Sequence, residues 1–135
     1  MRVYIIVVLA CMITASCKKN NVTGQQTIAG RWELRQSSGG VAGTVNYNPG
    51  NGSVYVFDNM DSYQLLDSAA IVRSGTYNIS AAVNPGDWIL KLHHLVNSQS
   101  QTDTDSIRFS NNQLIFLATS SCCDMPTLFY EKLQY

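Results

Sequence analysis

Gly30-Arg31-Trp32-Glu33-Leu34-Arg35 is the stretch that decides the fold. Its apolar side chains, Trp32 and Leu34, alternate with charged ones. Successive residues of an extended strand point to opposite faces, so the two apolar side chains share one face and the charged side chains share the other. The pattern predicts a half-buried β-strand that packs its Trp32 face against a core.

The rest of the chain repeats this pattern in short segments. We expect further strands over residues 53–58, 62–66, 69–80, 88–93, 105–109, 113–118 and 127–133, with a short extension of strand pairing around residues 44–47. About eight strands at a spacing of roughly 8–12 residues indicate an all-β sandwich or barrel. Consecutive hairpins favour an antiparallel meander, and closing it into an up-and-down barrel removes the exposed edges. No window after residue 17 has a helical period.

The segments between the strands carry turn residues. Residues 37–52 form the longest loop, and residues 97–103 read as a polar loop. Asn111-Asn112 suits a two-residue hairpin turn, because asparagine tolerates positive φ. Gly75, in the middle of the strand 69–80, predicts a bulge or bend.

Composition limits the classes of protein that this chain can belong to. With 135 residues and a formal net charge of zero, it holds one small domain and no basic field that would attract nucleic acid. Ser, Thr, Asn and Gly are frequent, and charged residues make up 13%. This mix favours strands and turns over helices.

The first residues have the pattern of an export signal. Arg2 is followed by an apolar run from Val3 to Ile13, which is long enough for a signal-peptide core and too short to span a bilayer stably. Thr14-Ala15-Ser16-Cys17 then resembles the cleavage box of bacterial lipoprotein precursors, which places two small residues before the cysteine that receives the lipid. Thr14 stands where leucine is usual.

The resemblance implies that Cys17 becomes the lipidated N-terminus, with diacylglycerol and palmitate attached. We therefore expect a cleaved signal over residues 1–16, a lipidated cysteine with a polar tether over residues 17–29, and the barrel domain over residues 30–135. Cys11 is a rival lipid site, and cleavage of an ordinary secretory signal nearby is the other alternative. Lys18, where aspartate would favour retention in the inner membrane, indicates the outer membrane, with its face undecided.

The predicted barrel resembles the lipocalin-like lipoproteins of Gram-negative envelopes. Gly30-Arg31-Trp32 matches their Gly-x-Trp motif, and the long loop after the first strand falls where lipocalins have a lid loop. Ser74-Gly75-Thr76-Tyr77 and the last strand, Leu128 to Leu133, support the match. The sequence lacks a Thr-Asp-Tyr motif. The resemblance implies an eight-stranded barrel that is closed at the Trp32 end and open at the other, with Lys132 as the candidate to cap Trp32.

Apolar side chains from every strand would converge on the inner face: Trp32, Leu34, Val56, Tyr63, Leu65, Tyr77, Trp88, Leu90, Phe109, Leu114 and Phe116. They either fill the interior or leave room for one ligand. The candidate ligand contacts are Tyr47, Tyr55, Tyr63, Tyr77, Trp88 and Phe116. Tyr47 and Tyr55 are expected at the mouth.

Two groups of residues carry other chemistry. Cys122-Cys123 is a candidate disulfide or redox pair, and a structural role in a turn is the alternative, because neighbouring cysteines form a strained ring. Asp103 and Asp105 share a face if their strand starts early, where they could bind calcium or act as acid and base; otherwise they are solvated residues at a loop edge.

His93 and His94 point to opposite faces and are expected as solvated or rim histidines, not as ligands of one metal ion. We expect no catalytic residue, no metal and no cofactor, since the sequence has no nucleophile motif and no phosphate loop.

The sequence supports two main hypotheses about function, and a third, an envelope module that associates with an enzyme or inhibits one. The first is a monomeric, membrane-anchored lipoprotein that binds a small apolar or amphipathic molecule. The second is an envelope lipoprotein with a filled core that docks a partner protein. The volume of any cavity that opens to solvent distinguishes the first two.

Overall fold

The structure is a computed structural model that describes residues 27–118 and 125–134. These residues contain nine strands and no helix. The strands are β1 (Gly30–Ser38), β2 (Thr44–Asn46), β3 (Val54–Phe57), β4 (Ser62–Asp67), β5 (Ala70–Ala81), β6 (Asp87–Val96), β7 (Gln99–Ser110), β8 (Gln113–Leu117) and β9 (Thr127–Lys132).

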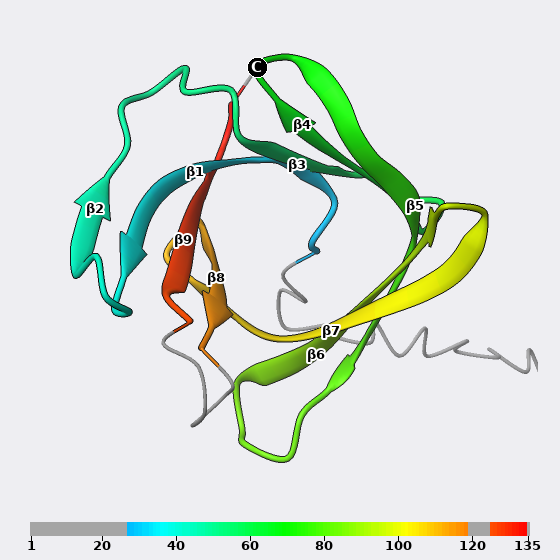
Figure 1. Cartoon of the computed structure of the whole chain (residues 1–135). Coiled ribbons are helices and arrows are strands. Elements are labelled where there is room, and N and C mark those ends of the chain that lie inside the picture. The colour runs from blue at the N-terminus through cyan, green and yellow to red at the C-terminus, as the bar shows by residue number, and fades with distance from the viewer. Residues whose placement is uncertain (1–26, 119–124, 135) are drawn as a thin grey trace, which may run out of the picture.

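Eight of the strands close into a barrel (Figure 1). From β3 to β9 each strand pairs antiparallel with the next along the chain, and β9 pairs antiparallel with β1 to close the ring. The short β2 is an extra strand that pairs with the second half of β1, where Ser37 lies opposite Val45. The all-β, antiparallel, up-and-down barrel predicted from the sequence is confirmed.

The long loop after β1 does not cover the barrel. β2 and the segment after it lie outside the ring of strands, beside β1 (Figure 1). Asn51 holds this segment down, because its Nδ2 donates to the carbonyl oxygens of Leu34 at 2.7 Å and Asn48 at 2.9 Å. The lid position implied by the family resemblance is therefore not the one observed.

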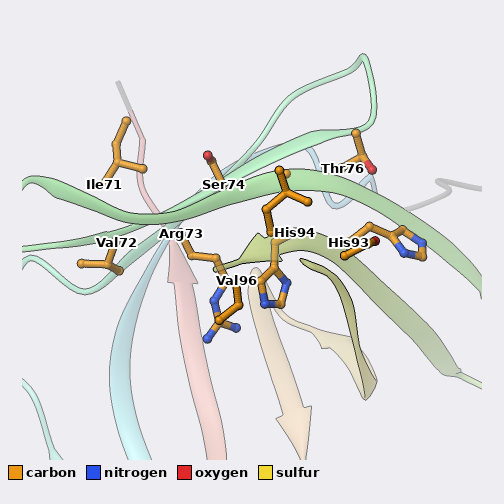
Figure 2. Close-up of a pocket in the computed structure, with 11 residues that line it drawn as sticks. Ile71, Val72, Arg73, Ser74, Thr76, His93, His94 and Val96 are labelled. Atoms are coloured by element: carbon orange, nitrogen blue, oxygen red, sulfur yellow. The ribbon is translucent and has the colours of Figure 1, made fainter. Parts of the chain in front are cut away.

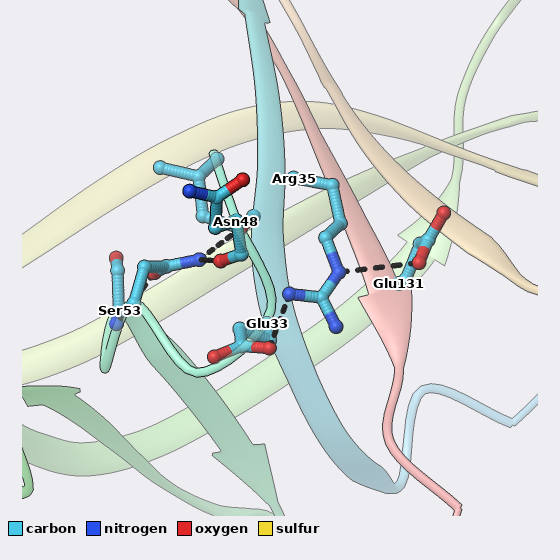
Figure 3. Close-up of polar contacts among 7 residues, drawn as sticks. Glu33, Arg35, Asn48, Ser53 and Glu131 are labelled. Carbon is cyan, nitrogen blue, oxygen red and sulfur yellow. Dashed lines mark hydrogen bonds and ion pairs between the residues drawn. The ribbon is translucent and has the colours of Figure 1, made fainter. Parts of the chain in front are cut away.

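This loop buries a charged residue on the outer wall. Glu33 is only 3% exposed, and Arg35 forms ion pairs with Glu33 and with Glu131 of β9 (Figure 3). The contact between Arg35 Nε and Glu131 spans 3.2 Å. This network joins β1 to β9 at the seam that closes the barrel, so its role is structural.

The core lies inside the barrel and is rich in aromatic rings. The register opposes Trp32 to Tyr55, which places both side chains on the inner face. Tyr55 stacks on Phe57 at 5.5 Å between ring centroids and on Phe116 at 5.4 Å. Tyr130 packs against Tyr55 at 5.5 Å.

The register corrects the predicted face of β3. Val56 lies opposite Arg31 and Gln64 and faces outward, whereas Tyr55 and Phe57 face inward. Every residue from Val54 to Phe57 is apolar, so alternation within this strand could not reveal which face is buried.

The segment predicted as a polar loop over residues 97–103 is also corrected. Only Asn97 and Ser98 form the turn, with φ of 50° and 65°, and β7 begins at Gln99. Positive φ at both central residues gives a tight two-residue hairpin. The polar residues after the turn belong to a strand because they pair with β6 along its whole length.

Candidate functional site

An opening of about 700 Å³ lies in the barrel wall where β5 and β6 separate. The two strands are paired from Ala81 and Trp88 up to Gly75 and His94, and the pairing stops there. Residues 71–76 of β5 and 93–96 of β6, with Ser100 of β7, line the opening. Two strand segments with free edges therefore border a gap in the barrel wall.

Gly75 sets the point at which the strands part. A Cβ on Gly75 would lie 1.9 Å from the carbonyl oxygen of His93, a distance that no side chain could occupy. The absence of a side chain therefore allows β5 to approach β6 closely at their last pair. The bulge predicted at Gly75 lies elsewhere in the strand, at Val72, where the pairing with β4 shifts register between Leu65 and Leu66.

Charged side chains of the inner wall lie beside this opening. Arg73 and His94 point to the same side of their strands, towards β8 and β9, whereas Ile71, Ser74 and Thr76 point the opposite way (Figure 2). The inner wall at the opening is thus polar, in contrast to the aromatic core.

Arg73 reaches across the inner wall to β7. Its Nη1 contacts Asp103 Oδ2 at 2.6 Å, and both side chains are partly exposed. Asp103 lies opposite Leu92, a buried inward residue, which confirms that β7 starts early enough to bring Asp103 and Asp105 onto one face. Both carboxylates lie on the inward face of β7, so they are strand residues and not residues at a loop edge.

The Asp105 carboxylate has no hydrogen bond or ion pair within residues 27–118 and 125–134. Burial raises the pKa of Asp105, the neighbouring Asp103 carboxylate raises it further, and Arg73 acts in the opposite direction. The Asp105 carboxylate therefore lacks a compensating charge of its own.

Two buried polar atoms on the inner wall have no hydrogen-bond partner among the described residues. They are the hydroxyl of Tyr63, whose residue is 1% exposed, and Nδ1 of His94, whose residue is 5% exposed. The register places both opposite Gly75, on either side of β5. Of the two expected positions for His94, solvated or at a rim, the structure shows the second, because His94 is buried and lines the opening.

The aromatic cluster lies next to these polar groups. Burial raises the pKa of Tyr55 to about 12, with Asp105 as the next largest cause. Burial also raises the pKa of Tyr130, and Tyr55 and Asp105 add to the rise. Asp105 is thus close enough to both phenols to oppose their ionisation.

The predicted ligand contacts divide into three groups. Tyr55, Tyr63 and Phe116 belong to the buried aromatic cluster, so Tyr55 lies in the core and not at the mouth. Tyr77 is also buried, but its hydroxyl donates to the carbonyl oxygen of Asp58 at 2.7 Å, near the β3–β4 turn. Tyr47 belongs to the loop outside the barrel, where its backbone N–H donates to the carbonyl oxygen of Arg35.

Trp88, the remaining predicted contact, packs against the core from the first half of β6 and is partly buried. The polar residues of the inner wall, Arg73 and His94 at the opening and Asp105 further along β7, were missing from the predicted contacts. The strand alternation could have found them, because each shares a face with core residues. A charged residue that shares the inward face of its strand with apolar residues indicates a polar position inside the barrel.

The Gly-x-Trp motif lies at the base of the barrel. Trp32 is 3% exposed, its Nε1 donates to the carbonyl oxygen of Ile28 at 2.7 Å, and its ring lies 6.2 Å from that of Phe109. Lys132 Nζ lies 5.3 Å from the centre of the Trp32 ring, so Lys132 caps this tryptophan.

Gly30 is required at the base for two reasons. Its φ of +140° is one that other residues rarely adopt, and a Cβ would lie 2.6 Å from Lys132 Cε.

Three predicted site residues, Cys17 and the pair Cys122 and Cys123, lie outside the described residues. Within residues 27–118 and 125–134, no group of three or more His, Cys, Asp or Glu side chains could hold a metal ion. The same residues contain no helix that is long and apolar enough to cross a membrane.

Comparison with known proteins found no matching family model, no similar curated protein and no similar solved structure.

Proposed function

We propose that this chain is a membrane-anchored, lipocalin-like lipoprotein that binds a small amphipathic molecule through the opening between β5 and β6. The observation that carries the proposal is the pair of unpartnered polar atoms, Tyr63 Oη and His94 Nδ1, on the inner wall. A buried polar group without a partner costs about 1–3 kcal/mol. A ligand that supplies hydrogen bonds to these atoms would remove this cost.

The distribution of side chains supports an amphipathic ligand. The opening has a volume of about 700 Å³, which is in the range of small-molecule sites at roughly 300–1,000 Å³. Arg73, His94 and Asp103 supply polar groups near the opening, and the aromatic cluster around Tyr55 lies deeper. A molecule with a polar end and an apolar body matches this order.

The anchor belongs to the same proposal. Lipidation of Cys17 would hold the barrel at the cell envelope, on the outer membrane, by a polar tether that ends at residue 29. Two or more acyl chains make such attachment stable, whereas one chain holds a protein only weakly. A barrel held at a membrane has access to amphipathic molecules from the bilayer. We propose a binding role without catalysis, supported by the lack of a nucleophile motif in the sequence.

The test is native mass spectrometry of the full-length protein, extracted from its membrane without detergent. We expect a small lipophilic molecule to remain bound. Val96→Trp places a large ring at the inner rim of the opening and should remove the adduct. The matched control is Val41→Trp, because Val41 is 95% exposed in the loop outside the barrel. A wild-type protein that carries no adduct would contradict the proposal.

A specific observation also favours the second candidate function, docking of an envelope protein. Ile71, Val72 and Leu95 line the opening and are 56%, 59% and 72% exposed. Exposed apolar groups that lie together mark interaction sites. If the extracted wild-type protein carries no small molecule and a second protein instead protects these three side chains from solvent, docking replaces ligand binding as the function.

A further inference from the structure

We infer that the bound molecule is a cationic amphiphile, with an ammonium group at its polar end and an apolar tail. This inference rests on the proposed function and names the chemical class of its ligand. It follows from the charge, the hydrogen-bonding groups and the aromatic rings of the inner wall beside the β5–β6 opening.

The charges of this inner wall do not balance. Arg73 is the basic side chain there, and its contact with Asp103 at 2.6 Å neutralises both groups. Asp105, two residues further along the same face of β7, is left without an ion pair within the described residues. One negative charge therefore remains without compensation on a partly buried surface. Burial raises the pKa of Asp105, as expected for a carboxyl group that lacks a cation.

The unpartnered polar atoms provide an independent indication of a ligand. Tyr63 and His94 are both more than nine-tenths buried, and neither Tyr63 Oη nor His94 Nδ1 has a partner in the described part of the chain. A phenol oxygen can accept a hydrogen bond, and so can the unprotonated nitrogen of a neutral imidazole. The Asp105 carboxylate is a further acceptor on the inner face of β7, where it lies opposite Leu90. An alkylammonium group has three N–H donors and no acceptor, as lysine does.

Aromatic rings near Asp105 favour the same kind of ligand. Tyr55 and Tyr130 pack edge to face, with ring centroids 5.5 Å apart, and the charge of Asp105 acts on both phenols. Tyr55 also stacks on Phe57 and Phe116, so these rings offer apolar contact to a ligand and not an open face to a cation. The apolar tail would pack against the aromatic cluster that these two rings share with Phe116.

An anionic head group is disfavoured by the same arrangement. A carboxylate or phosphate at this wall would face the uncompensated charge of Asp105, while the guanidinium of Arg73 is already engaged by Asp103. Like charges in a partly buried site repel strongly, because the local dielectric is low. Fatty acids and phosphate monoesters are therefore expected to bind less tightly than amines of the same chain length.

The test compares two probes of equal chain length, octylammonium and octanoate, by isothermal titration against the purified full-length chain at neutral pH. A blank titration of each probe into buffer without protein is subtracted. We expect octylammonium to bind at least about tenfold more tightly, a difference of roughly 1.4 kcal/mol.

Two variants test the roles of the carboxylates. Asp105→Asn should remove most of the preference for octylammonium, because the uncompensated charge is lost. Asp103→Asn frees Arg73 and should strengthen octanoate binding. Asp67→Asn is the matched control, since Asp67 is an exposed carboxylate at the end of β4 and should leave both affinities unchanged. Circular dichroism checks that each variant is folded.

Tighter binding of octanoate by the wild-type protein would overturn the cationic ligand and leave the proposed binding function intact. An unchanged preference in folded Asp105→Asn would also overturn it. If neither probe binds, both the ligand class and the proposed function fail.

Discussion

Trp32 is held at the base of the barrel by groups that are far apart in the sequence. Its Nε1 donates to the carbonyl oxygen of Ile28, its ring packs against Phe109, and Lys132 lies over the ring. The alternation in residues 30–35 predicted that Trp32 is buried. The capping by Lys132 depends on closure of β9 onto β1, which no local pattern reveals.

We predict that Lys132→Met lowers the free energy of unfolding by about 0.5–1 kcal/mol, because the cation over the Trp32 ring is lost while the aliphatic stem is kept. Urea denaturation measures this change. The control is Lys91→Met on the exposed face of β6, which should stay within about 0.5 kcal/mol of the wild type. An equal loss in both variants would show that the contact with Trp32 contributes nothing.

The raised pKa of Tyr55 predicts that the folded protein loses stability at alkaline pH. Burial raises this pKa to about 12 in the folded protein, whereas an unfolded tyrosine ionises near pH 10. Between about pH 10 and 12, the unfolded chain has lost a proton that the folded chain retains, so the free energy of unfolding falls as pH rises. Tyr55→Phe should make this decline less steep in denaturation experiments across that range. A slope equal to that of the wild type would contradict the prediction.

At the scale of elements, the β5–β6 pair decides where the barrel wall opens. Gly75 was expected to bend its strand, but its contact with the backbone of His93 shows that it permits a close approach. Which neighbour a strand approaches is a property of the sheet and not of the strand. The sequence could therefore mark Gly75 as special without showing the reason.

We expect Gly75→Ala to destabilise the protein by about 3 kcal/mol, because the added Cβ would overlap the carbonyl oxygen of His93 and force β5 away from β6. Chemical denaturation provides the measurement. Ser74→Ala, on the exposed outer face of the same strand, is the control and should change stability by less than about 0.5 kcal/mol. A tolerated alanine at position 75 would refute the close approach.

The β4–β5 hairpin contains an unusual residue for its conformation. Ala69 has a φ of 68°, which is unfavourable for alanine and free of strain for glycine. Ala69→Gly should therefore raise the free energy of unfolding by about 0.5–1 kcal/mol. Ala70→Gly, one residue later inside β5, should lower it instead, because glycine weakens a strand. Thermal unfolding of the two variants tests whether their stabilities change in opposite directions.

At the scale of the whole molecule, the barrel and the proposed anchor divide the chain into two parts with different roles. Closure through β1 and β9 gives a domain whose free edges are confined to places such as the β5–β6 opening. The anchor stays a prediction from the sequence, since residues 1–26 lie outside the described structure.

We predict that Cys17→Ser abolishes metabolic labelling with palmitate, because the thiol that carries the lipid is removed. Cys11→Ser should leave labelling intact, since Cys11 lies within the cleaved signal. Persistent labelling of Cys17→Ser, or its loss in Cys11→Ser, would assign the lipid to another residue.

The sequence by itself determined the class of fold, because alternation of apolar and polar residues is a local property that each strand carries alone. It also determined the hairpin turn at Asn111-Asn112, where φ is 45° and 67°. It failed where both faces of a strand are apolar, as in β3, and where a strand is polar, as at the start of β7.

Only the tertiary structure decided the site. Arg73, His94 and Asp103 come from three strands, and they share the inner face because the barrel's register places them there. Register depends on pairing energies summed over neighbouring strands, so a single strand does not encode it. The opening beside them exists because β5 and β6 part at Gly75, a consequence of how the closed sheet coils.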